Sequence, residues 1–123
     1  MKPPPLPHAT HEELVENILT LLAGYGIPAS ETDASRAFGR DGKPRKSKVK
    51  PGWPDISGTL PGGRSLYVEA KVGRDKLRPE QVRMLMKLHC AGALVIVARS
   101  VDDVQRRIAV PVATAVALGK SHR

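Results

Sequence analysis

The stretch that most constrains the fold lies in the middle of the chain, at residues 52–71. Its sequence, GWPDISGTLPGGRSLYVEAK, predicts a β-hairpin, because residues 61–63, Pro-Gly-Gly, separate two strand-like runs. Successive side chains of a strand point to opposite faces. On the return arm this alternation assigns Leu66, Val68 and Ala70 to a core face, and Tyr67, Glu69 and Lys71 to the opposite face.

The length of the turn decides whether this hairpin can hold a site. A two-residue turn would point the side chains of Asp55 and Glu69 to opposite faces. A turn of three residues, 61–63, pairs Asp55 with Glu69, and directly opposed residues share a face. Pro61 suits a type I turn and Gly63 the left-handed position that follows it. We therefore predict the three-residue turn.

Two carboxylates that converge with room for water can hold Mg²⁺ or Mn²⁺, because both ions prefer oxygen ligands. Lys71, on the same face as Glu69, could orient or deprotonate a water, or offset negative charge that develops on a phosphate. The alternative interpretation is an ordinary surface cluster of ion pairs, which contributes little energy.

Further motifs accompany the hairpin. They are Gly-x-Pro-Asp at 52–55, Glu-Ala-Lys at 69–71, Leu-Arg-Pro-Glu-Gln at 77–81 and Ala-Gly-Ala-Leu-Val-Ile-Val-Ala-Arg-Ser-Val-Asp-Asp-Val at 91–104. In this order and spacing they resemble the Pro-Asp…(Asp/Glu)-x-Lys signature of restriction-endonuclease-like nucleases. Within that superfamily, the closest likeness is to the virus-type replication-repair nuclease (VRR-NUC) domain. The likeness runs from about residue 13 to residue 104.

The resemblance implies an α/β fold with a restriction-endonuclease-like core. We expect a central mixed sheet of about four strands, flanked by helices on both sides, in the order α-β-β-β-α-β-α. It also implies metal-dependent hydrolysis of DNA phosphodiesters. The alternatives are a nickase or exonuclease with the same site, and a catalytically silent DNA-binding subunit.

The resemblance also assigns roles to individual residues. Asp55, Glu69 and the backbone carbonyl of Ala70 would hold Mg²⁺ or Mn²⁺, Lys71 would assist the attacking water, and Gln81 would position that water or the phosphate. Gln81 could instead be a solvent-facing helix residue. An acid early in the first helix would approach the metal. Glu13 matches that position best and Glu12 is the runner-up, although Glu13 could serve only as a helix cap.

The basic character of the chain is local. The formal net charge is +8, and residues 36–50 hold seven Lys or Arg against one acid, Asp41. A local basic block suits a polyanion, so we expect a DNA-binding loop over 36–52, although most charge runs are only solvated. Its candidate DNA contacts are Arg36, Arg40, Lys43, Arg45, Lys46, Lys48 and Lys50. Trp53 could stack on a base, but we expect it to pack structurally.

The remaining elements follow from periodicity and from breaking residues. We expect a Pro-rich disordered lead-in at 1–9, a single nuclease domain at 10–110 and a tail at 111–123. Within the domain, we predict a helix from Thr10 to about Gly24, a short strand near 29–34 and a helix that begins at Pro79 and ends at Gly92. Its buried face would comprise Val82, Leu85, Met86 and His89 or Cys90. Residues 93–98 read as a strand buried on both faces, followed by a helix from Ser100 to about Ile108, which Pro111 would end.

The remaining expectations concern compartment and assembly. Cys90 is the one cysteine, and we see neither an apolar run of membrane-spanning length nor a signal peptide, so we expect a cytoplasmic protein without membrane contacts. The resemblance agrees with a phage or prophage origin. It also implies that small members act as homodimers on branched DNA, such as Holliday junctions. His8 and His11 are three residues apart, but nothing nearby completes a metal site with them.

Overall fold

The structure, a computed structural model, describes residues 10–32 and 50–118. These residues form three helices and four strands in the order α-β-β-β-α-β-α, as the sequence predicts. The elements are α1 (His11–Gly24), β1 (Ala29–Glu31), β2 (Ile56–Thr59), β3 (Ser65–Ala70), α2 (Pro79–Cys90), β4 (Leu94–Ala98) and α3 (Val101–Ala117). None of the described helices combines the length and apolar character that a membrane span requires.

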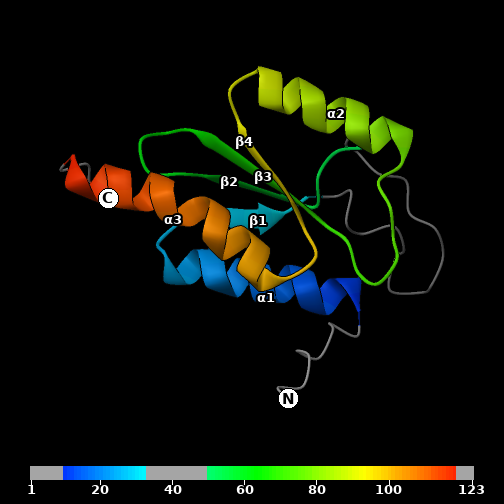
Figure 1. Cartoon of the computed structure of the whole chain (residues 1–123), viewed down its shortest axis with the longest axis horizontal. Helices are drawn as coiled ribbons and strands as arrows, with labels where there is room; N and C mark the ends of the chain where they lie inside the picture. Colours follow the sequence, from blue (N-terminus) through cyan, green and yellow to red (C-terminus); the bar gives the residue numbers. More distant parts are fainter. Residues whose placement is uncertain (1–9, 33–49, 119–123) are drawn as a thin grey trace, which may run out of the picture.

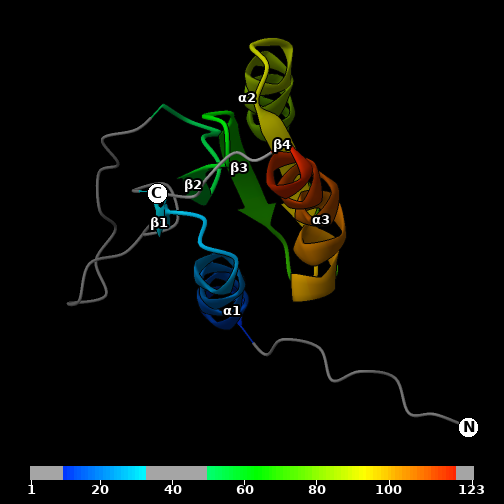
Figure 2. The ribbon, with the colours of Figure 1, turned by 90° about the vertical axis from the view of Figure 1, so that its left-hand side faces the viewer.

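The four strands form one mixed sheet in the order β1-β2-β3-β4 (Figure 1). The β1–β2 and β2–β3 pairs are antiparallel, whereas β4 runs parallel to β3. A parallel neighbour requires a crossover, which here contains α2. Helices α1 and α3 contact each other on one side of the sheet, and α2 lies against β4 on the other side (Figure 2). The chain therefore has the α/β architecture with helices on both sides that the sequence predicts.

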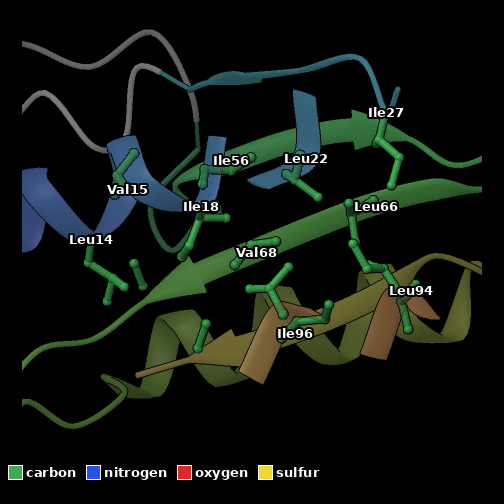
Figure 3. Close-up of a cluster of buried hydrophobic side chains, with 14 of the residues drawn as sticks. Leu14, Val15, Ile18, Leu22, Ile27, Ile56, Leu66, Val68, Leu94 and Ile96 are labelled. Atoms are coloured by element: carbon green, nitrogen blue, oxygen red, sulfur yellow. The ribbon is translucent and has the colours of Figure 1, made fainter. Parts of the chain in front are cut away.

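The core lies between the sheet and the α1–α3 pair. Helix α1 contributes Leu14, Val15, Ile18 and Leu22, and the facing strands contribute Ile56, Leu66, Val68, Leu94 and Ile96 (Figure 3). These side chains follow helical spacing in α1 and alternate positions in the strands, so each element presents one apolar face. The alternate strand positions consequently point to the other side of the sheet, where the candidate site lies.

The hairpin has the predicted register. Strand pairs Ile56–Val68 and Thr59–Ser65 are opposed, and the Leu60 amide donates to the Arg64 carbonyl at 2.8 Å across the three-residue turn. The predicted type I turn is wrong. Gly62 has a φ of +93° at the third turn position, which corresponds to type II, and the following Gly63 has a φ of +94°. Two adjacent glycines allow this turn because both positions lie in a region that other residues avoid.

The prediction that Pro111 ends the last helix is wrong, since α3 continues to Ala117 and crosses the predicted boundary at residue 110. A proline inside a helix removes one backbone hydrogen bond and costs about 3 kcal/mol. The apolar face continues past it, because Val112 packs against the core and Ala115 is buried. Packing therefore overrides the local helix-breaking tendency.

Two burial predictions are also wrong, and both concern the α2 side of the sheet. Among the predicted face of α2, only Leu85 is buried, whereas Val82 and Met86 are exposed and Cys90 is an exposed free thiol. Strand β4 is not covered on both faces, since Val97 is 39% exposed. The reason is shared: in the described part of the chain α2 packs mainly along β4, so the outer face of the helix and Val97 stay accessible.

Candidate active site

Asp55 and Glu69 lie next to each other on the α2 side of the sheet. Asp55 directly precedes β2, and continuation of the hairpin register pairs it with Glu69 near the end of β3. Their exposed fractions are only 5% and 3%. Burial of two neighbouring carboxylates is unfavourable unless donors or cations compensate for the lost water. The surrounding side chains supply part of that compensation.

One oxygen of Asp55 has two donors. Its Oδ2 accepts the backbone N–H of Ala70 at 2.9 Å and the Nε2–H of His11 at 3.0 Å. His11 is the first residue of α1, directly after the Thr10 cap. The start of α1 is therefore attached to the site. Our sequence reasoning missed this contact, because the two residues are 44 positions apart and no local pattern links them.

Glu69 has one satisfied oxygen and one unsatisfied oxygen. Its Oε2 accepts a hydrogen bond from Nε2 of Gln81 at 3.0 Å and lies 3.5 Å from the ammonium of Lys71. Its Oε1 is buried and has no hydrogen-bond partner among the residues that the structure describes. An unpaired buried polar atom costs about 1–3 kcal/mol, so native proteins rarely retain one without a reason. This oxygen is therefore a candidate ligand atom for a cation.

Gln81 joins the two charged residues of β3. Its Oε1 accepts from Nζ of Lys71 and from the backbone N–H of Arg78, each at 2.9 Å, while its Nε2 donates to Glu69. The amide thus has a donor on its oxygen side and an acceptor on its nitrogen side, which fixes its orientation. With an exposed fraction of 5%, Gln81 lies in the site and is not the solvent-facing residue of the alternative interpretation.

The electrostatics of the site shift two pKa values upward. Burial raises the pKa of Glu69 to about 7, and the negative charge of Asp55 acts in the same direction, while Lys71 opposes it. The hydrogen bond to Asp55 raises the pKa of His11 above its ordinary value, against the effect of burial. Shifted pKa values that cluster around one polar group are typical of functional sites.

Gly52 sets the distance between the hairpin and α2. It has a φ of +85°, and a Cβ at this position would overlap the backbone carbonyl of Glu80 and approach the amide nitrogen of Gln81 to 3.0 Å. The segment that leads into Asp55 therefore packs directly against the first turn of α2. Only glycine meets both the conformational and the steric requirement.

A search of solved structures finds a chain described as a "VRR_NUC domain protein", with a TM-score of 0.51. The match covers 85% of this chain and 87% of that chain, at 22% sequence identity. The fold is that of a VRR_NUC domain. No protein-family model and no curated protein matches the sequence. The fold expected from the sequence motifs is therefore confirmed, and the chemistry rests on the side chains.

Within this VRR_NUC fold, Asp55, Glu69, Lys71 and Gln81 come together as the motifs suggest. The expected helix acid does not join them. Glu13 and its alternative Glu12 are exposed, and the backbone N–H of Glu13 donates to Oγ1 of Thr10, as the capping interpretation requires. The residue of α1 that reaches the site is His11, because the helix begins with this residue facing Asp55.

Of the predicted DNA-binding residues, the structure describes only Lys50. Lys50 is exposed, directly before the segment that leads to Asp55. The other candidates lie outside the described residues: Arg36, Arg40, Lys43, Arg45, Lys46 and Lys48. Trp53 packs edge-to-face against Tyr67, with ring centroids 5.6 Å apart, in agreement with the structural role expected for it.

The donor set fits a hard cation that keeps most of its water. In the described part of the chain, no three His, Cys, Asp or Glu side chains form a group that could hold a metal. Mg²⁺ is commonly bound through one or two carboxylates and several waters, without a full protein cage. Asp55 and the unsatisfied Oε1 of Glu69 supply two such carboxylates. The residues present therefore fit Mg²⁺ or Mn²⁺ better than an ion that needs three or four protein ligands.

Proposed function

We propose that this protein is a metal-dependent nuclease that hydrolyses phosphodiester bonds in DNA. The observation that carries the proposal is the buried, unsatisfied Oε1 of Glu69 beside Asp55, on the strand face that also presents Lys71. A carboxylate pair with an adjacent amine is suited to phosphoryl chemistry. The VRR_NUC fold supports the same class of activity.

The metal-binding residues would be Asp55, Glu69 and the backbone carbonyl of Ala70. Bound there, Mg²⁺ or Mn²⁺ would polarise the phosphate and lower the pKa of a coordinated water. Asp55 is held by two donors on Oδ2, so its other oxygen is the one available for coordination. Glu69 is held on Oε2 and would coordinate through Oε1.

Lys71 and Gln81 would act on the attacking water and the phosphate. The Lys71 ammonium, 12% exposed at the side chain, would stabilise developing negative charge or orient the water. Gln81 holds this ammonium at 2.9 Å from its Oε1, so Lys71 stays near Glu69 without a direct short ion pair. Gln81 would therefore align the lysine and contact the water or the phosphate.

DNA affinity would come mainly from the basic segment at 36–50. Its charge of +6 accounts for most of the net charge of +8, and it ends at Lys50, shortly before the Asp55 strand in the sequence. Contacts between Lys or Arg and phosphates release counterions, which gives affinity without sequence preference. We propose that this segment binds the duplex part of the substrate.

The substrate we favour is branched DNA, cut by a two-fold homodimer. One 123-residue domain carries one candidate site, and symmetric cuts on a junction need two. The exposed apolar residues near the end of α3, Val110, Val116 and Leu118, offer a contact surface for a second copy. A monomer by sedimentation at micromolar concentration that retains cleavage would favour the nickase or exonuclease alternative.

The experiment that tests the proposed function compares linear, flapped and four-way-junction DNA, with and without Mg²⁺ or Mn²⁺. We expect cleavage only with the metal, and cleavage that Asp55→Asn and Glu69→Gln both abolish. Binding without any cleavage under all these conditions would favour the silent DNA-binding alternative.

A further inference from the structure

On the side of the sheet that carries the candidate site, polar residues continue along β2 and β3. Ser57 lies two residues after Asp55, and Tyr67 lies two residues before Glu69. Ser57 and Tyr67 are opposed and point to the same face as the two carboxylates. The next opposed pair on that face is Thr59 and Ser65. Each opposed pair forms one row across the strands. Ser30 of β1 extends the row of Ser57 and Tyr67, since it is paired with Ser57.

These residues line a shallow depression of about 510 Å³. Its described lining is uncharged and rich in hydroxyl groups. We call Ser30, Ser57, Thr59, Ser65 and Tyr67 the hydroxyl track. A second hollow, of about 290 Å³, adjoins it at Ser65 and Tyr67 and is also lined by Arg64. The track thus begins beside the site and ends at a cation.

We propose that the hydroxyl track binds an unpaired stretch of DNA strand that leads into the candidate active site. This inference rests on the proposed nuclease function and specifies its substrate as DNA with a single-stranded segment next to the cut. Three features favour this occupant: the spacing of the rows, the chemistry of the lining and the presence of Tyr67.

The spacing of the rows suits a single strand. Positions two residues apart on a β-strand are separated by about 6.8 Å, close to the distance between successive phosphates of an extended strand. The rows at Asp55–Glu69, Ser57–Tyr67 and Thr59–Ser65 therefore offer one polar position per nucleotide. Hydroxyl groups donate readily to phosphate and sugar oxygens.

Tyr67 favours an unpaired strand over a duplex. Trp53 packs edge-to-face against its ring, and Tyr67 lines the depression. Bases of an unpaired strand can stack on an aromatic ring, at about 1–3 kcal/mol per base, whereas the bases of a duplex are already stacked inside it. A protein partner is less suitable, because the centre of a protein interface is usually apolar or aromatic and this lining is mostly hydroxyl.

The test measures the affinity for a labelled duplex that carries an unpaired 5′ or 3′ tail of zero, one, two, four or eight nucleotides. The measurements are made in EDTA, so binding is separated from cleavage. We expect the affinity for one tail polarity to rise about tenfold over the first two or three nucleotides and then to level off.

Two variants add a negative charge to the track, Thr59→Glu and Ser65→Glu. Both positions are exposed, so the fold should tolerate them. We expect each to remove most of the gain from the tail, while Thr114→Glu, at an exposed position on α3 behind the sheet, leaves it unchanged. Tyr67→Phe should retain the gain because the ring remains, and Tyr67→Leu should lose it.

The outcomes separate this inference from the proposed function. Cleavage by wild type, together with an affinity that is independent of tail length or equal for Thr59→Glu and Thr114→Glu, would overturn the hydroxyl track and leave the nuclease intact. A tail-dependent affinity that Thr59→Glu removes, without cleavage under any metal condition, would support the track and overturn the nuclease.

Discussion

The Nε2 of His11 lies 3.0 Å from Oδ2 of Asp55, and the same Oδ2 accepts a hydrogen bond from the backbone N–H of Ala70. This contact joins the first turn of α1 to the entrance of β2. In the proposed metal site, it would leave Oδ1 of Asp55 to the metal. Groups that hydrogen-bond to a metal ligand commonly change metal affinity or activity by 10–100-fold when they are removed.

We therefore expect His11→Ala to weaken Mn²⁺ binding or slow cleavage by about 10–100-fold. The measurement is a Mn²⁺ titration followed by electron paramagnetic resonance, beside single-turnover cleavage. Imidazole added to the buffer should restore part of the loss, because it can replace the missing donor. The matched control is His89→Ala, which removes an exposed histidine of α2. Equal behaviour of the two variants would show that the contact is irrelevant to the site.

Lys71→Ala should separate chemistry from binding. An ammonium is not a metal ligand, so Mn²⁺ affinity should stay nearly normal, while the cleavage rate falls on the order of 10²-fold or more. Lys71→Arg should rescue little, because a guanidinium keeps the charge but not the shape or the titration of an amine. Single-turnover cleavage and filter binding on the same DNA give both quantities. Lys87→Ala, at an exposed position of α2, is the control.

Asp55→Asn and Glu69→Gln should lower both metal affinity and cleavage, but not DNA binding. Each variant loses a charged oxygen ligand, so metal affinity and cleavage fall together. Each also removes negative charge near the phosphate, so the DNA affinity of each variant should equal or slightly exceed that of wild type. Wild-type cleavage rates in both variants would mean that the nuclease site lies elsewhere.

The raised pKa of Glu69 predicts how stability without metal depends on pH. A folded-state pKa of about 7, above the ordinary 4.5, means that the folded chain holds this proton more tightly than the unfolded chain. The resulting stability is fully present below about pH 4.5 and is lost as the pH rises toward 7. Glu69→Gln should therefore raise the free energy of unfolding at pH 8.5, by on the order of 1–3 kcal/mol, and change it little at pH 4.5.

Urea denaturation in EDTA at the two pH values measures this difference. Glu16→Gln, at an exposed position of α1, is the control for the loss of one carboxylate. Added Mg²⁺ should stabilise the wild type more at pH 8.5 than at pH 5, because the metal competes with the proton for Glu69. An equal effect of Glu69→Gln at both pH values would contradict the buried-acid interpretation.

Gly52→Ala should reduce both stability and cleavage. Its Cβ would push the first turn of α2 away from the hairpin and displace Gln81 from Glu69. Gly63→Ala is a matched control, since Gly63 also has a positive φ but open space around its Cβ. We expect Gly63→Ala to lose about 1 kcal/mol of folding free energy and to keep its single-turnover rate. A similar rate for the two variants would show that the close approach at Gly52 does not align the site.

Neutralisation of Lys43, Arg45, Lys46 and Lys48 should weaken DNA binding and leave the rate at saturating protein near normal. Each phosphate contact contributes about 0.9 to the slope of log affinity against log salt, so four losses should flatten that slope by up to about 3.6. Binding isotherms over a series of salt concentrations give the slope. A slope equal to that of wild type would show that this segment lies away from the DNA.

The central hairpin could be predicted from sequence because its determinants are local. The alternation of β3 and the length of the turn at 61–63 decide which residues face Asp55, and both lie within twenty residues of one another. The presence of Asp55, Glu69 and Lys71 on one face follows from this register alone. The apolar stripe of α1 was predictable for the same reason, since it depends only on helical spacing.

Tertiary packing decided the features that depend on residues far apart in the chain. His11 reaches Asp55 across 44 positions, and only the docking of α1 beneath the sheet brings them together. Pro111 stays inside α3 because the core accepts Val112 and Ala115 beyond it. The position at which α2 docks against β4 decides which face of this helix is buried. It also decides how much of the sheet face with the hydroxyl track the helix covers. Local sequence sets which side of each element is apolar, but burial also depends on what packs against that side.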